Sequence, residues 1–216
     1  MVQRVAVIVM ILIACAAGSL YAAPADAPVK IVVLGDSLSA GYGLPAEAAF
    51  PEKLAQALRA KGIAATVANA GVSGDTSSGG LSRLDWSVPE GTQAVVLELG
   101  ANDALRGIDP QLTRKALDEI VRQLQQRHIL VLLCGMRAPR NMGPDYVQAF
   151  DSIFPALASE HGLVFYPFFL EGVATDPKLN QHDGLHPTAD GVEVIVAGIM
   201  PKIEDLIARV RAARAF

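Results

Sequence analysis

The chain has 216 residues, which is the length of one ordinary globular domain or slightly more. Hydrophobic residues make up 51% of it, enough for an ordinary core. The formal net charge is −4 and no Lys/Arg-rich run is present, which disfavours a nucleic-acid partner. Of the two cysteines, Cys15 lies in an N-terminal apolar run. The rest of the chain therefore cannot form an internal disulfide, and we expect Cys134 to be a buried small hydrophobic residue.

Residues 1–25 have the pattern of a secretory signal peptide. Arg4 supplies a positive charge, residues 5–17 form an unbroken apolar run, and Ala23-Pro24-Ala25 fits an A-x-A cleavage site. The run is shorter than the roughly 20 residues that a membrane-spanning helix needs. We therefore expect a single mature domain over residues 26–216, periplasmic or secreted, with no stable membrane insertion once the leader is cleaved.

Two other interpretations of the N-terminal segment stay open. Leu12-Ile13-Ala14-Cys15 fits a lipoprotein box, although the leader before it would be unusually short. An uncleaved membrane anchor would extend to Tyr21.

Beyond this segment, short apolar runs alternate with stretches of helical periodicity. Residues 30–35 are rich in β-branched side chains and end in Gly, as expected of a strand buried on both faces. Leu112, Ala116 and Ile120 recur on one face of a helix. In chain order, the expected elements are a strand over 30–35, a helix over 51–61, strands over 66–69 and 94–99, a helix over 111–127, a strand over 129–134, a helix over 146–161, a strand over 164–166, and closing helices over 189–213 that are interrupted at Pro201.

This alternation predicts an α/β fold with three α/β/α layers. Strands joined by helices require right-handed crossovers and a mostly parallel sheet. Five strands in this rhythm indicate the flavodoxin-like order 2-1-3-4-5. Ligands of such sheets bind beyond the carboxyl ends of the strands, where the strand order reverses. The loops that follow Gly35, Asn69 and Leu99 are therefore the candidates for a functional site.

The loop after the first expected strand contains a candidate nucleophile. Gly35-Asp36-Ser37-Leu38 places Ser37 where a strand passes into a helix. A serine there either caps the helix or attacks a substrate, and a nucleophile also needs a base, a group that orients the base, and oxyanion donors. The nucleophile elbow of α/β-hydrolases is excluded, because Ser39 stands where its second glycine should be.

The next two loops contain candidate donors of hydrogen bonds. Gly71, after the second expected strand, allows close approach of a ligand to the backbone and offers an unobstructed N–H. Asn102, after the third, could direct its side-chain amide at the same point. Each residue alone could equally belong to an ordinary turn.

The candidate base lies far along the chain, before the last helix. Asp183 and His186 are three residues apart, so the carboxylate could fix the imidazole tautomer and stabilise the imidazolium. A competing interpretation is a metal site, because His182 and His186 are four apart. Zinc usually needs a third protein ligand and a supporting shell, neither of which the sequence offers, so we expect no metal.

Taken together, these segments resemble the four blocks of the GDSL/SGNH hydrolases, which are named for Ser, Gly, Asn and His. Three further stretches, 41–44, 102–107 and 139–146, resemble the bacterial periplasmic thioesterase I/lysophospholipase L1/arylesterase group. The resemblance covers residues 30–208, and one departure is Ala101, where close relatives often have Gly. The four blocks are Gly35-Asp36-Ser37-Leu38, Gly71 in its Asn-Ala-Gly context, Gly100-Ala101-Asn102-Asp103, and Asp183-Gly184-Leu185-His186-Pro187.

The resemblance implies an SGNH hydrolase fold and a serine esterase with a Ser-His-Asp triad. Ser37 would be the nucleophile, His186 the base, and Asp183 the group that orients it. The oxyanion donors would be the Ser37 N–H, the Gly71 N–H and the Asn102 side chain. Substrates would be small carboxylic esters, acyl thioesters or lysophospholipids, hydrolysed without a cofactor, and we expect a monomer.

The acyl chain is expected to lie across apolar loop residues. These residues would either contact substrate or anchor their loops on the core. They are Leu38, Val72, Leu105 and Met142.

Two other functions are compatible with parts of this pattern. A flavodoxin-like binding module could use residues 73–80 to bind a phosphate or flavin, but anion binding requires no base such as His186. A carbohydrate acetyl esterase would keep the fold and the nucleophile. The low aromatic content of 6% argues against that function, because sugars are commonly bound on aromatic platforms.

Overall fold

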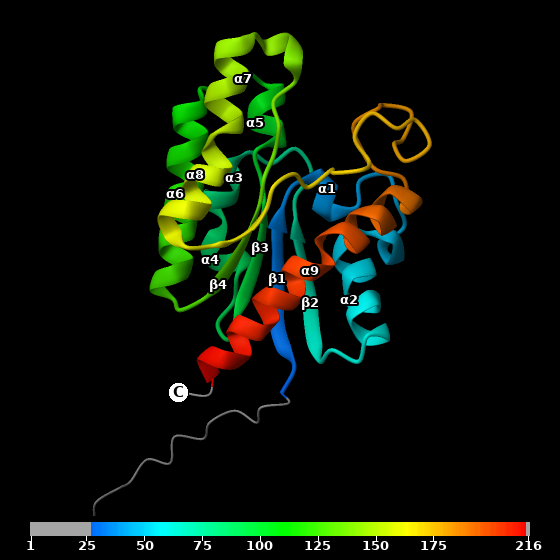
Figure 1. Cartoon of the computed structure of the whole chain (residues 1–216), viewed down its shortest axis with the longest axis vertical. Helices are drawn as coiled ribbons and strands as arrows, with labels where there is room; N and C mark the ends of the chain where they lie inside the picture. The colour runs from blue at the N-terminus through cyan, green and yellow to red at the C-terminus, as the bar shows by residue number, and fades with distance from the viewer. Residues whose placement is uncertain (1–26, 215–216) are drawn as a thin grey trace, which may run out of the picture.

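The computed structural model describes residues 27–214, so the expected signal peptide over residues 1–25 lies outside the described residues. At its centre is a five-stranded parallel sheet with the order β2-β1-β3-β4-β5 (Figure 1). This order confirms the predicted doubly wound architecture. The strands are β1 (Val29–Gly35), β2 (Ala65–Gly71), β3 (Ala94–Glu98), β4 (Leu130–Cys134) and β5 (Val164–Tyr166).

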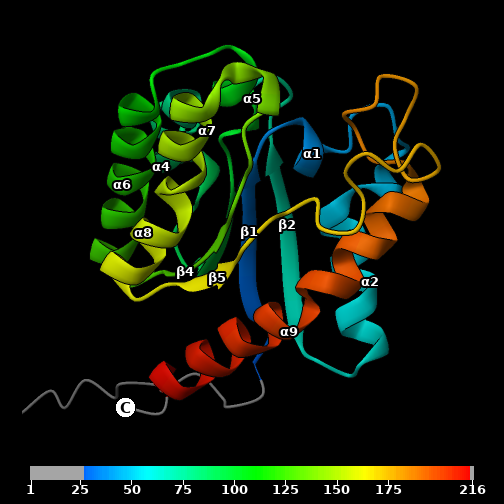
Figure 2. The ribbon, with the colours of Figure 1, turned by 45° about the horizontal axis from the view of Figure 1, so that its top comes forward.

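Helices cover both faces of this sheet and complete the three layers. They are α1 (Ser37–Ala40), α2 (Phe50–Ala60), α3 (Ser77–Ser82), α4 (Leu84–Ser87), α5 (Ala101–Leu105), α6 (Pro110–Gln126), α7 (Pro144–Asp151), α8 (Ile153–His161) and α9 (Ala189–Arg214), with 3-10 turns η1 (Ala46–Ala48) and η2 (Arg140–Met142). One face carries α2 and α9, which pack together, and the other carries α3, α6 and α8 (Figures 1 and 2). No helix within residues 27–214 has the length and apolar character needed to cross a membrane.

The core explains why the strands are so apolar. Every residue of β3 is buried, because this strand has neighbours on both sides and helices on both faces. β2 is an edge strand and is correspondingly half exposed. Since all strands are parallel, their carboxyl ends meet at one edge of the sheet, the upper edge in Figure 1, where α1 and α5 begin.

The helical predictions need two corrections. The single helix expected over 146–161 is two helices, α7 and α8, that meet at Ser152. The interruption expected at Pro201 is also wrong, because α9 continues through this proline. Ile199 and Ile203, on either side of it, are both fully buried. Packing of this apolar face against the sheet therefore outweighs the loss of one backbone hydrogen bond at the proline.

The single thiol of the domain has the environment expected from the sequence. Cys134 ends β4 and is completely buried. Burial raises the pKa of its thiol well above the ordinary value, so the reactive thiolate is disfavoured. Cys134 thus packs as a small hydrophobic residue.

Candidate active site

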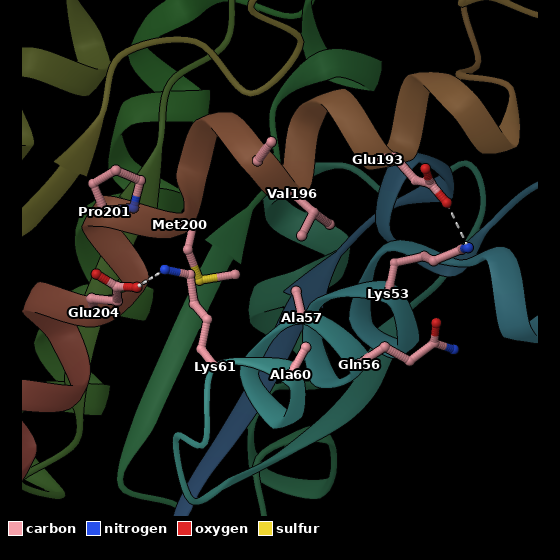
Figure 3. Close-up of a pocket in the computed structure, with 11 residues that line it drawn as sticks. Lys53, Gln56, Ala57, Ala60, Lys61, Glu193, Val196, Met200, Pro201 and Glu204 are labelled. Carbon is pink, nitrogen blue, oxygen red and sulfur yellow. Dashed lines mark hydrogen bonds and ion pairs between the residues drawn. The ribbon is translucent and has the colours of Figure 1, made fainter.

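At least three depressions among residues 27–214 are large enough for a small organic ligand, and they differ in chemistry. A groove of about 630 Å³ between α2 and α9 is lined largely by aliphatic atoms (Figure 3). Ion pairs Lys53–Glu193 and Lys61–Glu204 lie along it. A second depression, of about 850 Å³, lies in the segment before α9 and is lined by Asp176, His182 and Thr188 among others. A third, a cleft of about 680 Å³, lies beyond the carboxyl ends of the strands and is lined by Ser37, Asn102 and His186. Of these three, only the last brings a serine hydroxyl and an imidazole within hydrogen-bond distance, so it is the candidate active site.

Ser37 is placed at the cleft by the junction between β1 and α1. The Asp36 side chain caps α1 by accepting a hydrogen bond from the Leu38 N–H at 2.9 Å, so Ser37 is the first helical residue rather than the cap. A Cβ at Gly35 would lie 2.3 Å from Ser39 Oγ and 2.5 Å from Glu98 Oε2, closer than real contacts allow. Glycine is therefore required for the chain to turn into α1 at this point.

His186 and Asp183 lie next to Ser37, although the two segments are far apart in the sequence. Nε2 of His186 is 2.9 Å from Ser37 Oγ, and Nδ1 is 2.6 Å from Asp183 Oδ2. The other oxygen of Asp183 accepts hydrogen bonds from the His186 N–H at 3.0 Å and the Leu185 N–H at 2.9 Å. These backbone bonds, followed by the bond to the imidazole, lower the pKa of Asp183 to about 2.

The ionisation of Asp183 determines which way the hydrogen bonds of His186 run. An ionised carboxylate only accepts, so Nδ1 carries the proton and donates it to Asp183. Nε2 of a neutral imidazole then has a free lone pair and can accept the Ser37 hydroxyl proton. The three side chains are thus arranged for transfer of a proton from Ser37 to His186.

Tyr42 and Gln181 hold the loop that contains His186 against the segment that includes α1. The ring of Tyr42 packs on the imidazole of His186, with 4.5 Å between ring centroids. The Gln181 side-chain amide donates to the carbonyl of Tyr42 at 2.7 Å and to that of Pro187 at 2.9 Å. These contacts link the loop before α9 to the segment after α1, and they explain how two distant parts of the chain keep a fixed spacing.

Asn102 lies at the start of α5 and also lines the cleft. Its Nδ2 donates a hydrogen bond to Asp36 Oδ2 at 3.0 Å, which fixes the orientation of the amide. One amide hydrogen remains for a ligand in the cleft. Asp36 is completely buried, and this burial is the main cause that raises its pKa to about 6. No local pattern indicates this role for Asp36, because the contact joins residues 66 positions apart.

Gly71 does not occupy the position expected of an oxyanion donor, which corrects the sequence-based assignment. Its N–H donates to Asn69 Oδ1 at 2.9 Å, and the residue does not line the cleft. Gly74, three residues later, does line it, with a φ of +82° that favours glycine. The Gly74 carbonyl accepts from Arg106 Nη2 at 2.7 Å. The signal for Gly74 was present in Ser73-Gly74-Asp75, but only the loop conformation separates it from Gly71.

The expected acyl-contact residues divide into two pairs. Leu38 and Leu105 line the cleft, whereas Val72 and Met142 lie outside its lining. A further part of the lining was not anticipated from the sequence, because it comes from the loops that follow β4 and β5. Its members are Met136, Arg137, Ala138, Pro139, Arg140, Phe168, Leu170, Glu171, Gly172, Ala174 and Thr175.

Within residues 27–214, the group of side chains spaced closely enough to hold a metal lies away from the cleft. Asp118, Glu160 and His161 have ligand atoms within 4.8 Å of one another. Nε2 of His161 is already 2.7 Å from Asp118, and Arg114 contacts both carboxylate oxygens of Glu160. This group is therefore accounted for as an ion-pair cluster between α6 and α8.

The comparison with known proteins agrees with this geometry. The model of the GDSL-like lipase/acylhydrolase family matches residues 33–194. The chain is 42% identical to an arylesterase of Vibrio mimicus over 166 residues, 76% of this chain and 83% of the relative. It is 39% identical to thioesterase 1/protease 1/lysophospholipase L1 of Escherichia coli K12 over 187 residues, 86% and 87% of the two chains.

A solved structure extends the likeness to the fold. AlinE4, described as an SGNH-hydrolase family esterase, superposes with a TM-score of 0.70 at 45% identity, covering 82% of this chain and 96% of AlinE4. The chain therefore belongs to the GDSL-like lipase/acylhydrolase family and is an ester-hydrolysing enzyme.

Proposed function

We propose that this enzyme is a serine esterase that hydrolyses carboxylic esters and acyl thioesters through a Ser37–His186–Asp183 triad and an acyl-enzyme. The observation that carries the proposal is the continuous hydrogen-bonded series at the cleft. Ser37 Oγ, the imidazole and the Asp183 carboxylate are joined by contacts of 2.9 and 2.6 Å. This is the geometry that a hydroxyl nucleophile needs from its base and from the group that orients the base.

The reaction takes place in two halves. In the first, Ser37 Oγ attacks the carbonyl carbon while His186 Nε2 takes the hydroxyl proton. The tetrahedral intermediate collapses as His186 returns that proton to the alcohol or thiol leaving group, and the acyl group remains on Ser37. In the second half, His186 takes a proton from water as the water attacks the acyl-enzyme. The second tetrahedral intermediate collapses as His186 returns that proton to Ser37 Oγ, and the carboxylic acid is released. Asp183 stabilises the imidazolium in both halves.

Three donors are proposed to stabilise the negative oxygen of the intermediate. They are the Ser37 N–H, the Asn102 side chain and the Gly74 N–H, which takes the role first expected of Gly71. Ser37 begins a helix, so its N–H has no intrahelical acceptor. Asn102 has one amide hydrogen beyond the one bound by Asp36. Gly74 lines the cleft with both residues.

The cleft supports an acyl substrate with an apolar chain. Leu38, Leu105, Met136 and Leu170 all contribute apolar side chains to its lining. The relatives named arylesterase and thioesterase/lysophospholipase favour aryl esters, acyl thioesters and lysophospholipids as the compounds to assay first.

The direct experiment is a hydrolysis panel over acyl length and leaving group, with the wild type and Ser37→Ala side by side. The proposal predicts turnover of p-nitrophenyl acetate and of longer acyl esters by the wild type, and loss of all of them in Ser37→Ala. Circular dichroism and the melting temperature should stay unchanged. Activity of Ser37→Ala near that of the wild type would exclude Ser37 as the nucleophile.

Export is proposed from the sequence of the leader. A protein cleaved after residue 25 would act in the periplasm or outside the cell. N-terminal sequencing of the exported protein should find a start near Asp26. An intact Met1 on the exported chain would instead favour the uncleaved anchor.

A further inference from the structure

Arg83 is a buried arginine close to the active site that does not line the cleft. It lies between α3 and α4 and is 6% exposed. Its Nε donates to Asp75 Oδ2 at 2.6 Å, so the charge is paired. A buried guanidinium is costly unless its donors are satisfied, and here four hydrogen bonds surround it. So many fixed contacts indicate a specific task at this place in the fold.

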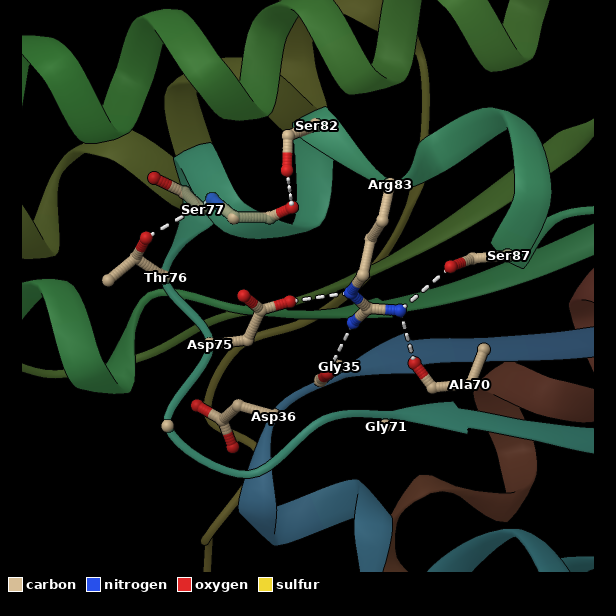
Figure 4. A network of polar contacts seen from close by, with 12 residues as sticks. Gly35, Asp36, Ala70, Gly71, Asp75, Thr76, Ser77, Ser82, Arg83 and Ser87 are labelled. Atoms are coloured by element: carbon tan, nitrogen blue, oxygen red, sulfur yellow. Dashed lines mark hydrogen bonds and ion pairs between the residues drawn. The ribbon is translucent and has the colours of Figure 1, made fainter.

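Two of those hydrogen bonds reach the backbone at the carboxyl ends of neighbouring strands (Figure 4). Nη2 donates to the carbonyl of Gly35 at 2.9 Å, and Nη1 donates to the carbonyl of Ala70 at 2.8 Å. Gly35 and Gly71 are register partners in β1 and β2. The guanidinium therefore bridges the last residue of β1 and the last but one of β2. Ser87 Oγ, 2.9 Å from Nη1, completes its surroundings.

Two of the three anchor points lie within two residues of a proposed oxyanion donor. Gly35 is two residues before Ser37, and Asp75 directly follows Gly74. The Gly35 carbonyl also accepts the Val72 N–H at 3.0 Å, so β1 is tied to the same loop a second time. A shift of the guanidinium would consequently change the spacing between the Ser37 N–H and the Gly74 N–H.

We propose that Arg83 is a positioning residue for the oxyanion hole. It holds the ends of β1 and β2 and the Gly74–Asp75 turn at the spacing that directs two backbone N–H groups at one oxygen. The inference rests on the proposed function, and Arg83 acts through the backbone without contacting substrate. The planar guanidinium of arginine, with several donors in fixed directions, suits this task. A lysine ammonium is a single point charge on a flexible side chain.

Arg214 is the matched control, because it makes the same kind of contact at the opposite end of β1. Its Nη1 donates to the Ala27 carbonyl at 2.7 Å, and its Nη2 donates to the Pro28 carbonyl at 3.2 Å. These carbonyls precede the amino end of the strand, away from the cleft. Substitution of Arg214 should therefore affect stability without moving an oxyanion donor.

The experiment compares Arg83→Lys and Arg214→Lys in the full chain with p-nitrophenyl acetate as substrate. Rates are expressed per active site titrated with an organophosphonate, so that only folded enzyme is counted. Arg83→Lys should lower kcat by about 10- to 100-fold with KM changed less than about twofold. Misplaced donors weaken stabilisation of the transition state more than binding of the substrate. Arg214→Lys should lower only the melting temperature.

Asp75→Asn serves as a second variant that perturbs the hydrogen bonds of Arg83 less severely. Asparagine keeps the size of the side chain and one acceptor oxygen, but it removes the charge that pairs with Arg83. Its kcat should fall by a smaller factor than in Arg83→Lys, again with little change in KM. This variant decides the matter if Arg83→Lys does not fold.

Two outcomes separate this inference from the proposed function. If Ser37→Ala is inactive while the folded Arg83 and Asp75 variants keep wild-type kcat per titrated site, the positioning role is overturned and the esterase mechanism stands. If Ser37→Ala itself remains active, the mechanism fails and the positioning role fails with it.

Discussion

At the scale of single residues, Asp36 connects the nucleophile to the oxyanion hole. One of its oxygens accepts the Leu38 N–H at the start of α1, and the other accepts Asn102 Nδ2. Two acceptor oxygens are needed, because both partners are donors. An asparagine at this position has only one oxygen, so either the helix cap or the orientation of Asn102 would be lost.

Asp36→Asn should therefore lower kcat by about 10²–10³, the usual effect of losing one oxyanion donor, with KM nearly unchanged. Asp109→Asn is the control. Asp109 caps α6 by accepting a hydrogen bond of 2.9 Å from the Gln111 N–H, and it does not line the cleft. Steady-state kinetics of both variants check the prediction. In an Asn102→Ala background, the Asp36 substitution should have little further effect, and full additivity would contradict the link between the two residues.

Asp183 makes a separate prediction about pH. Its pKa of about 2 means that the carboxylate stays ionised wherever the enzyme is normally assayed, and loses its charge only as the pH falls through that value. The profile of kcat/KM against pH should thus show no ionisation between about pH 3 and about pH 4.5, the range in which an ordinary aspartate titrates. An ionisation in that range, in a pH profile measured with the wild type, would contradict the assignment.

At the scale of elements, α9 shows how packing overrides a local signal. Pro201 lacks a backbone N–H and its ring crowds the preceding turn, which explains the predicted interruption. The helix persists because Ile195, Ile199 and Ile203 all have 0% exposure and lie on the face toward the sheet. The sequence shows the proline, whereas the number of contacts that compensate for it becomes visible only in the folded structure.

Pro201→Ala should consequently stabilise the protein by up to about 3 kcal/mol, because the restored N–H can bond within the helix and the ring is removed. Urea unfolding of the wild type and the variant measures the difference. Lower stability of the variant would mean that the proline ring itself packs in the groove between α2 and α9 more favourably than the helix geometry indicates.

Helix α3 illustrates the opposite case, an element without a strong sequence signal. Its Ser- and Gly-rich sequence has low helix propensity. The helix forms because Thr76 caps it at the Gly79 N–H and because Asp103 accepts hydrogen bonds from the N–H and the hydroxyl of Ser77 at 2.8 and 2.5 Å. Asp103 lies in α5, the helix that follows β3, so this support depends on the tertiary fold.

At the scale of the whole molecule, two buried carboxyls near the nucleophile make the free energy of unfolding depend on pH. Burial raises the pKa of Asp36 to about 6 and that of Glu98 well above its ordinary value. The unfolded chain releases these protons near about pH 4, whereas the folded protein keeps them to higher pH. The folded state thus binds more protons than the unfolded chain over this range. The free energy of unfolding therefore falls as the pH rises.

The free energy of unfolding should accordingly be larger at about pH 5 than at about pH 8. Glu98→Gln should flatten this dependence, since glutamine cannot ionise but can still accept from Ser39 Oγ, which lies 2.5 Å from Glu98 Oε2. Denaturant titrations of both proteins at the two pH values give the comparison. If the free energy of unfolding changed equally between the two pH values in both proteins, Glu98 would not be one of the groups responsible.

The predictability of the site follows from distances along the chain. Ser37, Asn102 and the Asp183/His186 pair could be named as candidates from the sequence, because each sits in a short motif at the end of an element and together the motifs resemble the blocks of a known family. The roles of Asp36 and Arg83 were not predictable in this way. Their partners Asn102 and Gly35 are brought to them only by the strand order β2-β1-β3.

The most direct test of the central claim is the identification of the residue that an organophosphonate modifies. The arrangement of Ser37 and His186 predicts one covalent adduct per chain, located by mass spectrometry on Ser37 and formed in proportion to the loss of esterase activity. Ser37→Ala should form no adduct and show no turnover. Complete inactivation of the wild type with Ser37 unmodified would contradict the account.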